Sequence, residues 1–194
     1  MLLTRINILL LTTFLTVGCA HNRKPQTLSN NNAEDTMATA TTTKFVLTSP
    51  VFKEGEMIPK KFGYKEANIS PPLEWRDVPP QVKSLTLLVE DPDAPMGTWI
   101  HWVIFDIPPS AHGLKEHVPT DKTLPDGAIQ GKNDFGDVGY GGPVPPSGTH
   151  RYFFKLYALD ITLKLQAGST KPEVMKAMQG HILGEAELMG RYAR

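Results

Sequence analysis

Stretches of alternating or continuous apolar residues recur along the last three quarters of the chain. They span 45–48, 84–90, 98–107 and 151–159, and they are rich in Val, Ile, Thr and aromatic residues. Segments rich in Pro and Gly separate them, and this combination predicts β-strands. The stretch 99–107 is apolar on both faces, which predicts a strand in the middle of a sheet that is covered on both sides. The pattern therefore favours a mainly β domain.

One helix is predicted to begin near Thr170. Thr170 stands three residues before Glu173 in a capping-box pattern, and Pro172 is tolerated in a first helical turn. The residues that then fall on one helical face are Val174, Ala177, Met178 and His181. Gly180 is expected to break or bend this helix, so a second short helix is predicted from 185 to 189.

The first residues have the pattern of an export signal. Arg5 precedes an apolar stretch, 6–17, which is shorter than the ~20 residues that a membrane-spanning helix needs. We therefore predict that residues 1–18 are a cleaved signal peptide. Gly18 directly before Cys19 resembles a bacterial lipobox, in which the cysteine is acylated and becomes the new N-terminus. The alternative is an ordinary signal peptide with an incidental cysteine.

Residues 19–43 are mostly small and polar, so they are predicted to form a flexible tether that leads to a folded domain, 44–194. Acyl chains on Cys19 would anchor this domain to a membrane of the bacterial envelope. Ala20 favours the periplasmic face of the outer membrane if the cell is Gram-negative.

The net charge and the cysteine content limit which binding partners and which covalent cross-links are expected. Twenty basic and twenty acidic residues give a formal net charge of zero and a pI of about 7.0. A nucleic-acid partner is not expected, because phosphate backbones are bound by basic faces. Cys19 is the single cysteine, so no internal disulfide can form.

Several polar residues stand at the ends of the predicted strands. They are Asp91, Asp93, His101, His150 and Tyr152. Period-two alternation places His101 on one face with Trp99, Val103 and Phe105, and it places His150 and Tyr152 together on one face of the last long strand. These residues are expected to converge on one polar pocket. A structural reading remains open, because aspartates in Asp-Pro-Asp can satisfy turn N–H groups and a lone histidine can be a hydrogen-bonded core residue.

Gly141 and Gly142 can present backbone N–H groups in conformations closed to other residues, which would make an anion-binding concavity, or they can simply bend a loop. Arg151 points away from His150 and Tyr152 and is not expected in the pocket.

From about Phe45 onward the chain resembles the phosphatidylethanolamine-binding protein (PEBP) family, in its bacterial and archaeal Raf kinase inhibitor-like branch. The segments that carry this resemblance are 68–75 (NISPPLEW), 91–95 (DPDAP), 97–102 (GTWIHW), 133–136 (NDFG), 141–152 (GGPVPPSGTHRY) and 180–183 (GHIL). The resemblance implies an antiparallel β-sandwich with a few peripheral helices. It also implies an anion pocket formed by Asp91, Asp93, His101, Gly142, Pro143, His150 and Tyr152. Many bacterial members have a cysteine where this chain has Val144.

The leading functional hypothesis is a membrane-tethered, non-enzymatic binding module for a phosphate-type anion, such as a phosphorylated head group or residue. Modulation of a partner protein such as a kinase follows from the resemblance alone. A hydrolase that uses the Asp, His and Tyr side chains is a second hypothesis, and a metal site of His101, His150 and Asp91 is a third. No cofactor is expected.

Overall fold

The computed structural model describes residues 43–194. The predicted signal peptide, Cys19 and all but the last residue of the tether lie outside the described residues. In chain order the elements are β1 (Thr43–Lys44), β2 (Val46–Thr48), η1 (Lys60–Phe62), β3 (Leu73–Arg76), β4 (Ser84–Asp91), β5 (Trp99–Ile107), β6 (Gly113–Leu114), β7 (Ile129–Gln130), β8 (Thr149–Leu159), α1 (Lys171–Met178) and β9 (Ile182–Ala193). Within this range no helix has the length and apolar character that a bilayer span requires.

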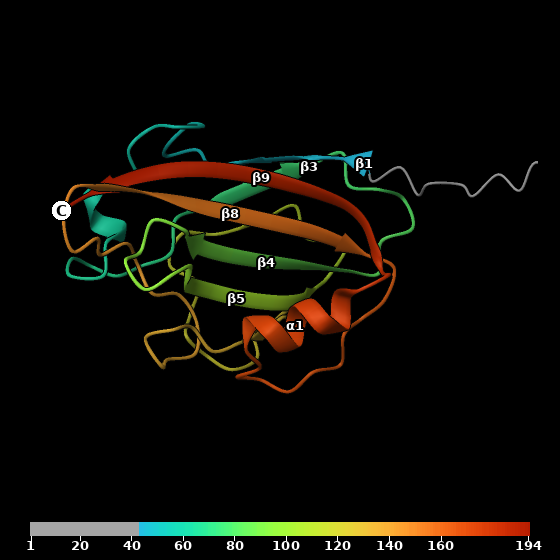
Figure 1. Cartoon of the computed structure of the whole chain (residues 1–194). Helices are drawn as coiled ribbons and strands as arrows, with labels where there is room; N and C mark the ends of the chain where they lie inside the picture. Colours follow the sequence, from blue (N-terminus) through green and yellow to red (C-terminus); the bar gives the residue numbers. More distant parts are fainter. Residues whose placement is uncertain (1–42) are drawn as a thin grey trace, which may run out of the picture. The chain divides into compact units, whose positions relative to one another are not determined.

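The strands form two sheets. The larger sheet has the order β1-β9-β8-β4-β5-β7, and the smaller one has the order β2-β3-β6. All pairings between neighbouring strands are antiparallel except that of β1 with β9. The long strands β9, β8, β4 and β5 lie side by side in Figure 1, with α1 beside β5 and the short strand β3 behind the larger sheet.

Hydrophobic side chains cover both faces of the larger sheet. On one face Trp102 and Phe154 belong to a core that they share with Trp75 of the smaller sheet. On the other face Phe105 belongs to a second core with Val174 of α1. The prediction that 99–107 is a strand covered on both sides is therefore confirmed, and the fold is the predicted mainly β, antiparallel sandwich.

The predicted start of the helix is also confirmed. Both the N–H and the hydroxyl of Thr170 donate to the Glu173 carboxylate, at 2.7 and 2.8 Å. These bonds satisfy a donor at the first turn, where the helix itself offers no acceptor.

The predicted second helix at 185–189 is wrong, because this segment lies within β9, which pairs with β8 from Thr149 to Leu159. Gly184, Ala186, Leu188, Gly190 and Tyr192 are buried, and the residues that alternate with them are more exposed, which is the period of two that strands have. Of the expected few helices, the described residues contain α1 and the one-turn η1. His181 lies beyond the end of α1, where its ring bonds Asp160 at 2.8 Å.

The predicted common face of Trp99, His101, Val103 and Phe105 is wrong in part, because Val103 and Phe105 share a core but His101 does not join them. Strand β5 contains a β-bulge, because Val89 lies opposite Trp102 while the next residue, Glu90, lies opposite Ile100. His101 is thus the extra residue with no direct partner on β4. A bulge re-aims a side chain, and it separates His101 from Val103, which packs in the core beneath α1.

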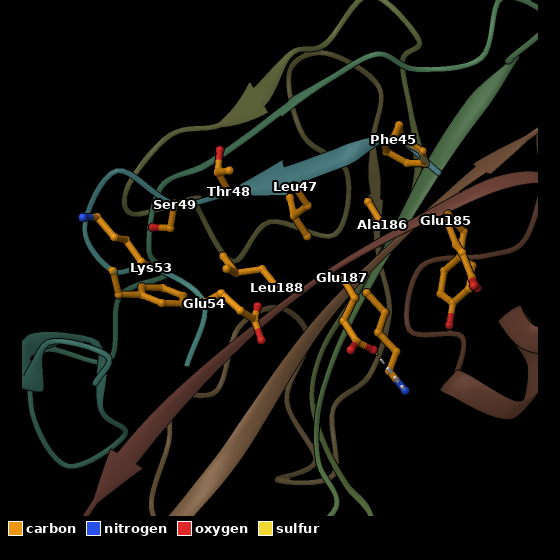
Figure 2. Close-up of a pocket in the computed structure, with 13 residues that line it drawn as sticks. Phe45, Leu47, Thr48, Ser49, Lys53, Glu54, Glu185, Ala186, Glu187 and Leu188 are labelled. Carbon is orange, nitrogen blue, oxygen red and sulfur yellow. Dashed lines mark ion pairs between the residues drawn. The ribbon is translucent and has the colours of Figure 1, made fainter. Parts of the chain in front are cut away.

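A groove of about 680 Å³ opens between β2 and β9 (Figure 2). Its floor is apolar, with Leu47 and Leu188, and charged side chains such as Glu54 and Glu187 line it as well. None of the predicted pocket residues lies in this groove.

Candidate functional site

His150 and Asp91 form a buried polar pair between neighbouring strands. His150 Nδ1 lies 2.7 Å from Asp91 Oδ2, and the two side chains are only 10% and 4% exposed. Asp91 Oδ1 accepts a second hydrogen bond, from the N–H of Asp93 at 2.8 Å. A carboxylate accepts the Nδ1–H proton, so the His150 ring is oriented and its Nε2 is its remaining polar atom.

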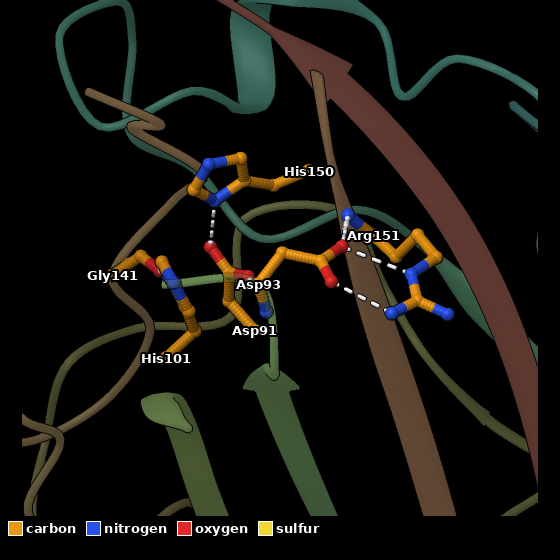
Figure 3. Close-up of polar contacts among 6 residues, drawn as sticks. All are labelled: Asp91, Asp93, His101, Gly141, His150 and Arg151. Atoms are coloured by element: carbon orange, nitrogen blue, oxygen red, sulfur yellow. Dashed lines mark hydrogen bonds and ion pairs between the residues drawn. The ribbon is translucent and has the colours of Figure 1, made fainter. Parts of the chain in front are cut away.

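The bulge of β5 brings His101 to the same place. His101 Nδ1 lies 2.7 Å from the carbonyl oxygen of Gly141, so Nδ1 must carry the proton and Nε2 is the acceptor in the neutral ring. Burial lowers the pKa of His101, and the bond to Gly141 and the charges of Asp91 and Asp134 offset this only in part. Figure 3 shows His101, His150 and Asp91 gathered at the ends of their strands.

Tyr152 completes the predicted group from β8. Its ring meets that of His101 edge to face, with the centroids 5.1 Å apart. Its hydroxyl is buried and finds no hydrogen-bond partner among the described residues. Burial, followed by the nearby charge of Asp91, raises the pKa of Tyr152, so the phenol stays a neutral donor.

A cavity of about 320 Å³ lies beside these groups. The residues that line it are Asp91, Ala94, Pro95, Met96, Trp99, His101, Phe135, Val144 and Pro146. Asp91 and His101 are its polar side chains apart from the indole of Trp99. The lining contains no serine, threonine or cysteine that could act as a nucleophile. It includes Asp91 but not its partner His150.

Asp93 is not brought into this lining. Its two carboxylate oxygens bind the Arg151 guanidinium at 2.7 and 2.9 Å, and it also accepts the Arg151 N–H at 2.9 Å. Figure 3 shows this pair pointing away from His101. The hydrogen bond with Arg151 lowers the pKa of Asp93 to about 2. Asp93 therefore fastens the turn after β4 to β8. The sequence alone does not predict this contact, because Arg151 is 58 residues away.

Gly142 and Pro143 also take other roles. The Gly142 N–H donates to Asn68 Oδ1 at 2.8 Å, and the Gly141 N–H donates to the His101 carbonyl at 2.8 Å. These N–H groups are therefore already bonded, and the predicted backbone anion site is not formed. A Cβ on Gly142 would overlap the Phe62 carbonyl oxygen, so glycine is needed for close packing. Pro143 lines a separate, smaller cavity with Lys60.

Phe135 is a site residue that the pocket prediction missed. Its ring stacks on Tyr64 with centroids 4.3 Å apart and meets His101 edge to face at 5.3 Å. Its neighbour Asp134 accepts the Ile100 N–H at 2.7 Å and so holds the start of β5 beside the cavity. The segment 133–136 is one of those that carry the family resemblance, and this was the signal in the sequence that could have identified Phe135 as a site residue.

The site carries one uncompensated carboxylate instead of two, because Arg151 neutralises Asp93. The remaining polar groups are Asp91 and the two imidazoles, and each imidazole has an Nε2 atom that can carry a proton. In residues 43–194 no group of three or more His, Cys, Asp or Glu side chains is arranged to hold a metal ion.

Comparisons with known proteins agree with this architecture. The phosphatidylethanolamine-binding protein family model matches residues 48–193. The chain is 54% identical to a UPF0098 protein of Methanothermobacter thermautotrophicus over 76% of this chain and 98% of that protein.

Two crystal structures are similar as well. A phosphatidylethanolamine-binding protein homologue of Chlamydia trachomatis has a TM-score of 0.72 and 44% identity, over 78% of this chain and 98% of that one. Escherichia coli YbcL, described as a member of the mammalian PEBP family, has a TM-score of 0.73 and 34% identity, over 78% of this chain and 99% of that one. The match to the family model over most of the chain shows that this protein belongs to the phosphatidylethanolamine-binding protein family.

Proposed function

We propose that the domain is a non-enzymatic binding module that takes a small phosphate-type anion at the cavity beside Asp91, His101 and His150. The observation that carries this proposal is the anchoring of both histidines through Nδ1, to Asp91 and to the Gly141 carbonyl. Among residues 43–194, no hydrogen bond from the protein reaches the Nε2 atom of His101 or of His150. Two oriented imidazoles are thereby available to a ligand, with a neutral phenol buried next to them.

The charge balance sets how the anion binds. With both histidines neutral the site has the single negative charge of Asp91, which repels an anion. Protonation makes each Nε2 a donor and turns this repulsion into attraction. The anion should therefore bind together with protons, and by linkage its binding should favour the protonated imidazoles.

Isothermal titration calorimetry with methylphosphonate tests the proposal. Repeating the titration in buffers of different ionisation enthalpy measures proton uptake directly, and we expect uptake at pH 7. Losing a charge-assisted hydrogen bond costs about 1.5–3 kcal/mol, so His150→Ala should weaken binding roughly ten- to a hundredfold.

His181→Ala is the matched control, because His181 bonds Asp160 through Nδ1 at 2.8 Å but lies on the surface away from the cavity. Equal losses in the two variants, or no methylphosphonate binding to the wild type, would reject the proposed site.

We further propose that the domain is tethered to a membrane through a lipid on Cys19, which rests on the lipobox resemblance of its flanking residues. Expression of the full chain with a fatty-acid probe tests this. Cys19→Ser should abolish labelling and release the protein from membranes, and unchanged labelling would refute lipidation at this residue.

A further inference from the structure

Within residues 43–194, two separate parts of the chain cover the outer edge of strand β9. At one end β1 pairs with Glu185. At the other end the N–H of Gly55 donates to the Met189 carbonyl at 2.8 Å. Between these parts the chain crosses into the smaller sheet as β2, which leaves the groove of about 680 Å³ beside residues 186–188 (Figure 2). An open strand edge is a template for pairing with another chain, so this gap is a place where one can add.

The backbone of Glu187 faces the groove. Along a regular antiparallel pair, residues alternate between those that bond the neighbouring strand and those whose N–H and C=O point away from it. Both backbone groups of Met189 bond the segment 54–55 and so point away from β8. Glu187 lies two residues earlier in the same unbroken register, so its N–H and C=O point outward as well. On this outer side no described residue bonds either group.

The side-chain hydroxyls on the opposite wall of the groove are already bonded. The Thr48 hydroxyl donates to the Glu74 carbonyl at 3.3 Å, and the Ser49 hydroxyl donates to the Pro72 carbonyl at 2.8 Å. The donor and acceptor left in the middle of the groove are therefore the backbone groups of Glu187. Another extended backbone matches this pair, as in the addition of a peptide to a sheet edge.

The side chains of the groove indicate what such a backbone carries. Leu47, Ala186 and Leu188 are buried and give the groove an apolar wall. The two ends of the groove carry opposite charges, with Glu185 at one end and Lys53 at the other (Figure 2). A free peptide that runs parallel to β9 points its ammonium group toward Glu185 and its carboxylate toward Lys53. The chain segments on both sides of the gap also run parallel to β9.

The gap limits the length of the peptide. Glu185 and Met189 already pair with other segments, and four residue steps of ~3.3 Å separate them, which is roughly 13 Å of strand. Three peptide residues fit in this length, and a longer strand would meet β1 or the segment 54–55. The volume of about 680 Å³ also falls in the range of small-molecule sites.

We propose that the groove binds a free peptide of about three residues as a short strand parallel to β9. The C=O of the first peptide residue accepts the Glu187 N–H, and the N–H of the third donates to the Glu187 carbonyl. The first and third side chains then lie on the same face as Ala186 and Leu188, so they are apolar. This site shares no lining residue with the cavity beside His101, so it is independent of the proposed anion site.

NMR titration of the isotope-labelled full chain with the tripeptide Leu-Ala-Leu tests the proposal. We expect the largest shift of a backbone amide signal at Glu187. The analogue that is N-methylated at the third residue lacks the N–H that bonds the Glu187 carbonyl, so it should bind about tenfold or more weakly. Capping both ends of the tripeptide removes its two charges and should weaken binding about two- to fivefold.

A pair of variants tests the same backbone contact from the protein side. Glu187→Pro removes the outward N–H, at an edge position where a strand tolerates proline, and should weaken binding about tenfold or more. Glu187→Ala keeps this N–H and is the matched control, with an affinity within about threefold of the wild type. The methylated peptide tests the pairing in the wild type, so the result does not depend on the folding of the proline variant.

Three results would each overturn the proposal: no Leu-Ala-Leu binding that shifts the Glu187 signal, equal affinity for the methylated peptide, or equal losses in the proline and alanine variants. None of these results would affect the proposed anion site.

Discussion

His150 and Asp91 are 59 residues apart in sequence and 2.7 Å apart in the fold, and both are almost completely buried. The same carboxylate also accepts the N–H of Asp93, so it serves two donors, one of them on a buried imidazole. One side chain thus orients an imidazole and closes the turn that leads to the cavity.

Asp91→Ala should therefore destabilise the domain. It leaves the His150 Nδ1–H and the Asp93 N–H without their acceptor. An unsatisfied buried donor costs about 1–3 kcal/mol, and the His150 donor is buried, so a loss of about 1–3 kcal/mol is expected. Urea unfolding followed by tryptophan fluorescence measures it. In the control Asp160→Ala, where the partner of His181 is exposed, the change should stay below about 1 kcal/mol. Similar losses in both variants would contradict the buried pair.

The stability of the domain should fall as the pH is lowered from 7 to 5. Burial lowers the pKa of His101 in the folded state, whereas the unfolded state titrates near the ordinary value of about 6.5. Below that value the unfolded chain binds more protons than the folded one, so the stability is fully present above about pH 6.5 and is lost as the pH falls towards the lowered pKa. Asp91 and Asp134 act in the opposite direction but do not reverse the shift.

Thermal unfolding of the wild type and of His101→Gln across this pH range checks the contribution of His101. Glutamine can still donate to the Gly141 carbonyl but does not titrate. The variant should show a shallower pH dependence, and an unchanged slope would show that His101 does not contribute.

Asp93→Asn should leave methylphosphonate affinity within about threefold of the wild type, which is less than 1 kcal/mol. The reason is that Arg151 already holds both oxygens of Asp93, and this pair points away from His101. A loss as large as that of His150→Ala would place Asp93 back in the anion site.

Glu90 is buried on β4 and forms ion pairs with Lys155 of β8 and Lys171 of α1. Burial alone would raise the pKa of Glu90, but the two lysines outweigh it, so the pKa is lowered. Removing both lysines leaves a buried charge without a partner, whereas removing Glu90 leaves lysines that are about 30% exposed and can reach water.

The double variant Lys155→Met with Lys171→Met should therefore lose about 3 kcal/mol and more than Glu90→Met does. Chemical unfolding compares them at pH 7. Lys61→Met, which breaks the exposed pair with Glu116, is the control and should cost less than about 1 kcal/mol. A larger loss in Glu90→Met than in the double variant would contradict this account.

The elements with local signals are predictable from the amino-acid sequence alone. The four predicted strands are strands in the structure, and the helix begins at Thr170 because Glu173, three residues on, supplies the acceptor. Strand β9 has a local signal too, in the alternation of Ala186, Leu188 and Tyr192. The expectation that Gly180 separates two helices overrides this alternation and misplaces the segment.

The role of each candidate side chain depends on contacts that form only when distant segments come together in the folded domain. His101 turns toward Tyr152 because β5 bulges against β4, and a bulge is a mismatch between two strands that one strand alone does not show. The N–H of Gly142 is taken by Asn68, 74 residues away, and the carboxylate of Asp93 by Arg151, 58 residues away. A motif places residues of the right chemistry near a site, but a polar group bonds the first partner that folding brings within about 3 Å. That competition between long-range partners separated Asp91, His101, His150 and Tyr152, which meet beside the cavity, from Asp93 and Gly142, which hold its surroundings together.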